Sequence, residues 1–214
     1  MKKIKNLFID FNGTLLDDVN LCLDLLNLFL KEQNKPLIEL NIYKHIFTFP
    51  IYDYYILAGL DFKNESFDSM ANRFIKRYKA KSPNCKLYDD VITTLEYLKS
   101  LNIKLIILSA SEKNMLIDQL KYYGIYKYFD DILGINDFHA KSKEQIGVDY
   151  INKKKLNLEE CLFIGDTIHD YEVASKMGVK SVLVSTGHQS KDILMQCGVD
   201  IIDSFSNIKE YLWF

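Results

Sequence analysis

Three side chains with catalytic potential follow apolar runs that are typical of buried strands. Asp10 follows residues 7–9, Ser109 follows residues 105–108, and Asp166 follows residues 161–165. Two basic residues, Lys141 and Lys143, stand just before a predicted helix. Because the carboxyl ends of parallel strands meet at one edge of a sheet, we expect these groups to converge on one site.

Such a set of side chains favours phosphoryl transfer. The carboxylates of Asp10 and Asp166 are hard oxygen ligands of the kind that Mg²⁺ prefers. A serine hydroxyl, a lysine ammonium and the backbone N–H groups of the turn at residues 12–14 can hold phosphate oxygens. A carboxylate beside a metal-bound phosphoryl group can attack it and form an aspartyl-phosphate, while lysine and metal neutralise the developing charge.

The elements that must position these residues alternate between strand and helix. Apolar runs at residues 4–10, 104–108, 132–133, 161–164, 181–184 and 199–202 are separated by amphipathic helical patterns. Continuous apolar strands that alternate with helices indicate an α/β fold, with a parallel sheet covered by helices on both faces. The sequence therefore predicts a Rossmann-like core.

A purely helical stretch interrupts this core after its first strand. Residues 17–81 show helical periodicity, so we expect a helical cap domain there and a core made of residues 1–16 and 82–214. An insertion at the carboxyl edge of the sheet is placed to cover the site and exclude water. Within it, the aromatic run at residues 49–55 is expected mainly as cap core, with a substrate pocket as the alternative, and Arg73 and Arg77 are expected in solvent.

Bulk properties narrow the class of partner. The 214 residues are 48% hydrophobic and 26% charged, with a net charge of −2, which gives no electrostatic reason to expect nucleic acid or an anionic membrane. The basic N-terminus has too short an apolar stretch for a signal peptide. Four scattered cysteines without metal-site spacing favour a reducing cytoplasm. Monomer and dimer both stay open.

The motifs, in their order along the chain, resemble those of the haloacid dehalogenase-like hydrolase superfamily. Residues 10–15, Asp-Phe-Asn-Gly-Thr-Leu, are similar to its first motif, and Ser109 is similar to its second. A lysine near a helix start corresponds to the third, and residues 165–167 together with Asp170 correspond to the fourth. The helical insertion resembles the small cap of the phosphoglycolate phosphatase-like branch.

The resemblance implies a role for each matching residue. The implied catalytic residues are Asp10 as nucleophile, Asn12, Ser109 and Lys143, with Lys141 as the alternative lysine. The implied phosphoryl-binding residues are Gly13, Thr14, Ser109, Ala110 and Lys143. The implied Mg²⁺ ligands are Asp10, Asn12 through its backbone carbonyl, Asp166 and Asp170.

One position departs from the family pattern. Related phosphatases usually carry an aspartate two residues after the nucleophile, which protonates the leaving group, and here that residue is Asn12. An amide cannot give up a proton near neutral pH. General acid–base catalysis contributes about 10²–10⁴-fold, so its loss penalises alkyl phosphates. Acyl phosphates, pyrophosphates and aryl phosphates, whose leaving groups are less basic, would suffer less.

Two functional hypotheses follow. The first is a Mg²⁺-dependent phosphatase for a small phosphorylated metabolite, with His169 or His188 as possible replacements for the missing acid, although a structural role is favoured for both. The second is a Mg²⁺- and phosphate-binding module with little catalysis. Carbon–halogen hydrolysis needs no Mg²⁺, and the retained acids Asp166 and Asp170 count against it.

Overall fold

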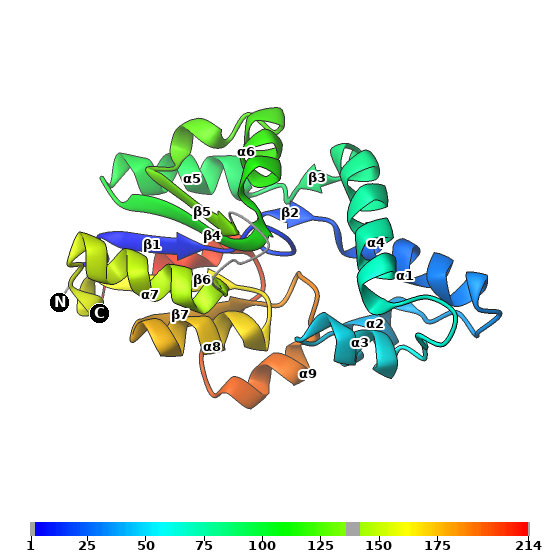
Figure 1. Ribbon diagram of the computed structural model, residues 1–214. Helices are drawn as coiled ribbons and strands as arrows, with labels where there is room; N and C mark the ends of the chain where they lie inside the picture. Colours follow the sequence, from blue (N-terminus) through cyan, green and yellow to red (C-terminus); the bar gives the residue numbers. More distant parts are fainter. Residues whose placement is uncertain (1–2, 136–141, 214) are drawn as a thin grey trace.

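The computed structural model describes residues 3–135 and 142–213, and the alternative lysine, Lys141, lies outside them. Its centre is a six-stranded sheet in the order β5-β4-β1-β6-β7-β8 (Figure 1). Every neighbouring pair in this sheet is parallel. The strands are β1 (Asn6–Ile9), β4 (Lys104–Glu112), β5 (Asp131–Ile135), β6 (Cys161–Gly165), β7 (Lys180–Val184) and β8 (Ile201–Ile202).

Strand β1 lies in the middle of the sheet, and all four of its residues, including the polar Asn6, are buried. Its last residue, Ile9, pairs with Ile107 on one side and Ile164 on the other. The chain order runs outward in both directions from β1, so the boundary between β1 and β6 is a topological switch point, where ligands of such sheets bind.

Helices cover both faces of the sheet, as the sequence predicted. Figure 1 shows α5 (Val91–Ser100) and α6 (Lys113–Tyr122) on one face, with α7 (Lys143–Lys154) and α8 (Ile168–Met177) on the other. Successive residues of β1 point to opposite faces. Leu7 therefore packs into the cluster that contains Leu95, and Phe8 into the cluster that contains Val173.

Short elements complete the core. Helix α9 (Lys191–Leu194) follows β7 and precedes β8 along the chain. Strand β2 (Leu16–Asp17) pairs with β3 (Lys86–Leu87) in a two-stranded antiparallel ribbon. The 3₁₀ segments are Ser82–Asn84, Tyr126–Tyr128, Leu158–Glu160, Met195–Cys197 and Phe205–Tyr211. The ribbon connects the core to the helical insertion, and the sequence did not predict it because two-residue strands show no periodicity.

Four helices occupy the insertion: α1 (Val19–Glu32), α2 (Leu40–Ile46), α3 (Ile51–Leu57) and α4 (Phe67–Lys81). We call α1–α4 the cap. It has its own buried cluster, which includes Phe29, Tyr43, Tyr54, Tyr55 and Met70. In Figure 1 the cap lies beside the carboxyl edge of the sheet. The domain division at residues 17 and 81 stays a prediction.

The two cap arginines are not simply solvated. Arg73 and Arg77 each form an ion pair with Glu32, at 2.8 and 2.9 Å. Both guanidinium groups also lie over the ring of Phe29, 4.9 and 5.2 Å from its centroid. Their side chains are 37% and 31% exposed, so both reach solvent as expected, while α1 also offers them a carboxylate and an aromatic face. This pairing commits both cations to the α1–α4 contact.

In the part of the chain that the structure describes, no helix is long and apolar enough to cross a membrane.

Candidate active site

The three predicted strand-end residues meet at one edge of the sheet. Asp10 follows β1 and Asp166 follows β6, while Ser109 lies inside β4, which extends four residues beyond the predicted end at Leu108. The pairing of β4 with β5 shifts between Leu108 and Glu112. Carboxylate oxygens of Asp10, Asp166 and Asp170 all lie within 4.8 Å of one another, and all three side chains are buried.

Lys143 joins this group from the start of helix α7. It is the first residue of α7, whose N-cap Ser142 accepts a hydrogen bond from the backbone of Gln145. Its Nζ donates to Asp10 Oδ1 at 2.5 Å and to Asp170 Oδ1 at 2.6 Å. The Lys143 side chain is only 4% exposed. We call Asp10, Asp166, Asp170 and Lys143 the acidic cluster.

The acidic cluster carries more negative than positive charge. Burial raises the pKa of Asp10 to about 8, with Asp170 and Asp166 adding to the rise and Lys143 opposing it. Burial also raises the pKa of Asp166 to about 6. Against the effect of burial, Lys143 holds the pKa of Asp170 below its usual value. One ammonium among three carboxylates leaves an excess of negative charge, which a bound cation would neutralise.

The donor set fits Mg²⁺. Its three acids offer carboxylate oxygens, which suit a hard divalent cation rather than a softer metal. Asp166 is fixed in place because Thr14 Oγ1 donates to its Oδ1 at 3.1 Å and the backbone N–H of His188 donates to its Oδ2 at 2.6 Å. Asp170 is fixed by a capping box with Thr167 at the start of α8.

The turn after Asp10 approaches Asp166 closely. Gly13 has φ +74°, and a Cβ atom added there would lie 2.3 Å from Asp166 Oδ2, so only glycine fits. Its N–H donates to Leu16 O at 2.9 Å and to Asp18 Oδ1 at 3.0 Å. The expectation that this N–H holds phosphate therefore does not match the structure, because the turn itself uses the donor. Thr14 likewise directs its hydroxyl to Asp166.

Asn12 is held by a buried carboxylate that the sequence did not single out. Its Nδ2 donates to Asp18 Oδ2 at 2.9 Å and to the Tyr78 hydroxyl at 2.6 Å. Its Oδ1 accepts from Ser111 Oγ at 3.1 Å. An aspartate in place of Asn12 would set two carboxylates against each other, which explains why an amide suits this position.

Asp18 also forms a buried ion pair with His188. The Nε2 atom of His188 lies 3.2 Å from Asp18 Oδ1, and its Nδ1 is 2.8 Å from the Tyr43 hydroxyl. Although burial opposes protonation, Asp18 raises the pKa of His188 to about 9. The same imidazolium holds the pKa of Asp18 below its usual value, again against the effect of burial. Both ring nitrogens of His188 are thus engaged.

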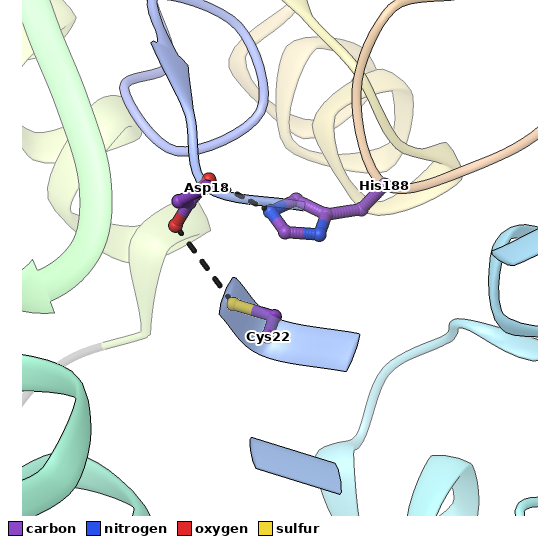
Figure 2. A group of neighbouring side chains, drawn as sticks. All are labelled: Asp18, Cys22 and His188. Atoms are coloured by element: carbon purple, nitrogen blue, oxygen red, sulfur yellow. Dashed lines mark hydrogen bonds and ion pairs between the residues drawn. The ribbon is translucent and has the colours of Figure 1, made fainter. Parts of the chain in front are cut away.

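Figure 2 shows Cys22 beside this pair, with its Sγ 3.9 Å from Asp18 Oδ2. An Asp, Cys and His trio has the donor types of a zinc site. Here, however, Gly13, Asn12, Tyr78 and His188 already surround the oxygens of Asp18. Burial also raises the pKa of the Cys22 thiol well above its usual value, which disfavours a metal-binding thiolate. The trio is therefore a hydrogen-bonded group.

We call Asn12, Asp18, His188, Tyr43 and Tyr78 the junction, because it joins core and cap. Tyr43 comes from α2 and Tyr78 from α4, whereas His188 comes from the loop after β7. The next residue, Gln189, adds a hydrogen bond to Phe47 O at 2.7 Å. The contacts of the loop at residues 187–190 hold the cap against the core.

A cavity of about 410 Å³ lies between the cap and the acidic cluster. Asp10, Ser109, Ala110 and Lys143 line its core side. The cap side includes Phe49, Ile51, Tyr54 and Tyr55. Tyr54 and Tyr55 belong to the cap core and also line the cavity, so the aromatic run at residues 49–55 contributes both to the cap core and to the cavity wall.

His169 reaches the same cavity from α8. Its Nδ1 faces two acids, Glu172 at 3.6 Å and Glu144 at 4.0 Å. Its ring lies 4.6 Å from the ring of Phe49. These contacts give His169 a defined place in the cavity wall.

Sequence reasoning missed Asp18, Ser111 and Tyr78 as members of the site. Asp18 follows another aspartate just before a helix, where an acid usually caps the helix. The structure shows no such cap from its side chain, which turns into the junction instead. The one sequence signal that could have pointed to Asp18 was the unusual Asn12 nearby.

Comparison with known proteins places this geometry in a family. The family model described as haloacid dehalogenase-like hydrolase matches residues 7–184. A pyrophosphatase PpaX from Oceanobacillus iheyensis is 26% identical over 207 residues, which cover 93% of this chain and 92% of that protein. A solved haloacid dehalogenase-like family hydrolase from Streptococcus pneumoniae has a TM-score of 0.79 at 22% identity, covering 97% of this chain and 98% of that chain.

A phosphoglycolate phosphatase from Vibrio parahaemolyticus is 26% identical over 126 residues, which cover 58% of this chain. The match spans 55% of that protein, and a second phosphoglycolate phosphatase, from Vibrio cholerae, is matched over 52% of its length. The chain thus spans about half the length of these curated relatives.

Proposed function

The chain belongs to the haloacid dehalogenase-like hydrolase family, and we propose that it is a Mg²⁺-dependent phosphatase that hydrolyses a small phosphorylated substrate through Asp10. The observation that carries this proposal is the acidic cluster itself. A buried carboxylate at a strand end faces a cavity and contacts a buried lysine and two further acids. Relatives named phosphatase and pyrophosphatase support the same reaction class.

In the first half-reaction, a carboxylate oxygen of Asp10 attacks phosphorus. The bond from phosphorus to the leaving oxygen breaks, and that oxygen departs with the electron pair. Asp10 is left as an aspartyl-phosphate. The Lys143 ammonium, which already contacts Asp10, offsets the negative charge that develops on the phosphoryl oxygens. Ser109, also in the cavity wall, is placed to donate its hydroxyl to the same group.

Asp10, Asp166, Asp170 and the backbone carbonyl of Asn12 are the proposed Mg²⁺ ligands. When bound, the cation would neutralise charge on the carboxylates and on the phosphoryl group.

In the second half-reaction, water attacks phosphorus and the bond to Asp10 breaks. Inorganic phosphate leaves, and the carboxylate is regenerated for another cycle. The cap, held by the junction, limits the access of other water to the intermediate. The alternative of a binding module with little catalysis is less well supported, because the nucleophile, the lysine and the metal acids are in contact.

Phosphate release from a panel of phosphorylated compounds tests this proposal. We expect release with Mg²⁺, none after chelation by EDTA, and none from the Asp10→Asn variant. Thermal stabilisation by Mg²⁺ and phosphate without any turnover would instead support the binding module. A reducing, cytoplasmic setting belongs to the same proposal, and it agrees with the free thiols of all four cysteines.

A further inference from the structure

We propose that the substrate is an aryl phosphate, a monoester whose leaving group is an uncharged phenol. The proposal rests on the proposed phosphatase function and narrows it to one substrate class. Two independent observations lead to it: the character of the cavity wall opposite Asp10, and the way in which Asn12 and His188 are occupied.

The cap contributes an aromatic wall to the cavity. Eight of its aromatic residues line the space, among them Phe47, Phe49, Tyr54, Phe67, Phe74 and Tyr78. Ile75 from α4 and Met115 from α6 extend the apolar surface. The volume of about 410 Å³ lies in the range of roughly 300–1,000 Å³ that is typical of pockets for organic ligands. Aromatic rings prefer such walls, because edge and stacked contacts add to apolar burial.

The polar ends of two wall residues are already used. The Tyr78 hydroxyl donates to Asp18 at 2.7 Å, and the Tyr43 hydroxyl contacts His188. These tyrosines therefore offer the substrate mainly their rings.

The charges in the wall disfavour an anionic leaving group. Among the described residues that line the cavity, Lys143 is the one lysine or arginine, and Asp10 and Asp170 already bind it. The cap arginines Arg73 and Arg77 are paired with Glu32. Glu112 adds a further carboxyl group to the rim. Among these described residues, a second carboxylate or phosphate on the substrate would lose water without meeting a lysine or arginine that is not already paired.

Two groups that could assist an alkyl leaving group, Asn12 and His188, are already engaged by their neighbours. The side-chain amide of Asn12 donates hydrogen bonds to Asp18 and Tyr78. Both ring nitrogens of His188 contact other side chains. His169 directs its Nδ1 toward Glu144 and Glu172. A phenolate is a far weaker base than an alkoxide, so it can depart without a proton from the protein.

The two observations select one class from the three that the sequence left open. Pyrophosphate has a good leaving group, but that group is a charged phosphate, which the apolar wall disfavours. Acyl phosphates of small metabolites leave the aromatic wall without a partner. Phosphoglycolate has both an alkyl leaving group and a carboxylate. An aryl phosphate fits both the aromatic wall and the engaged state of Asn12 and His188.

The test compares kcat/KM with Mg²⁺ for matched phosphates. Phenyl phosphate against benzyl phosphate varies the basicity of the leaving group with an aromatic ring in both. We expect phenyl phosphate to be favoured by at least about 10²-fold. 1-Naphthyl phosphate should exceed phenyl phosphate by about tenfold, because the second ring meets the apolar wall. 4-Carboxyphenyl phosphate, 2-phosphoglycolate and pyrophosphate should each be poorer than phenyl phosphate.

A cap variant checks that the wall sets this order. Ile75 is about half exposed on α4 and lines the cavity, so a lysine there can reach both water and the ligand. Ile75→Lys should raise kcat/KM for 4-carboxyphenyl phosphate relative to phenyl phosphate by about tenfold. The matched control, Ile75→Gln, should not change that ratio.

Three results would overturn the inference while leaving the phosphatase proposal standing. They are similar rates for benzyl and phenyl phosphate, a preference for 2-phosphoglycolate or pyrophosphate, and an unchanged ratio in Ile75→Lys. No phosphate release from any of these compounds would overturn the phosphatase function itself, and the substrate class with it.

Discussion

Two buried charged groups lie side by side in this molecule, and they are balanced differently. The acidic cluster places three carboxylates around one ammonium. The junction places the single carboxylate of Asp18 among an amide, a tyrosine hydroxyl, a backbone N–H and an imidazole. Burial raises the pKa of Asp10 to about 8, whereas the partners of Asp18 keep its pKa below the usual value.

The difference separates a group built for chemistry from one built for structure. Excess negative charge in the acidic cluster favours a bound cation, and such a cation would favour the ionised form of Asp10 that attacks phosphorus. The matched junction holds core and cap together and directs its polar groups mainly at one another. Each of the following variants either removes this difference or measures it.

The largest effect is expected from Lys143. Lys143→Met removes the only ammonium of the acidic cluster while keeping the length of the side chain. We expect kcat to fall by about 10²–10³-fold, because the phosphoryl charge loses its protein cation. The control is Glu144→Gln, the next residue on α7, which should leave kcat within roughly twofold. Equal effects in the two variants would argue against a catalytic role for the lysine.

Replacing Asp18 should mainly lower the free energy of unfolding. Asp18→Asn leaves the imidazolium of His188 without its counter-ion, and removing one partner of a buried pair costs about 3–5 kcal/mol. Urea denaturation measures this loss. Asp17→Asn, at the exposed neighbouring residue, should change the free energy of unfolding by less than about 0.5 kcal/mol. A urea midpoint for Asp18→Asn equal to that of the wild type would contradict the matched junction.

Exchanging the amide and the carboxylate sharpens the comparison further. The double variant Asn12→Asp/Asp18→Asn moves the acid to the position beside the nucleophile and keeps one amide and one carboxyl group in contact. We expect kcat/KM for benzyl phosphate to rise by about tenfold or more, with little change for phenyl phosphate. Asn12→Asp alone should be less stable than the double variant, because it sets two carboxylates together. If kcat/KM for benzyl phosphate does not rise in a folded double variant, the lack of an acid at position 12 is not what limits the hydrolysis of alkyl esters.

Cys22 should have the smallest effect. Because the junction oxygens already have donors, Cys22→Ala should cost less than about 1 kcal/mol and change kcat by less than roughly twofold. Metal analysis of the purified protein provides a second measurement. Zinc that is present in the wild type and lost in Cys22→Ala would mean that the trio in Figure 2 is a metal site.

Much of the fold and part of the site could be predicted from the sequence. The parallel sheet and its two helical layers follow from apolar strands that alternate with helices, and the strand-end positions of Asp10 and Asp166 follow from that sheet. Lys143 was predicted at the start of its helix, and the structure places it against Asp10. These features depend on local pattern and on one general property of parallel sheets.

The rest depends on contacts between distant residues. Tyr78 is 66 residues from Asn12, and Tyr43 is 145 residues from His188, so no local pattern indicates either contact. The use of the Gly13 N–H by Asp18 depends on how the turn closes. The pairing of Arg73 with Glu32 required the packing of α1 against α4. Such contacts decide which polar groups are free to meet a substrate.

The central claim is that Asp10 becomes covalently phosphorylated. The most direct measurement mixes the enzyme with phenyl phosphate and Mg²⁺, quenches with acid within one turnover, and examines the peptides by mass spectrometry. We expect a phosphoryl adduct on the peptide that contains Asp10, and none in the Asp10→Asn variant. Turnover without any adduct on Asp10, or an adduct that persists in Asp10→Asn, would contradict the account.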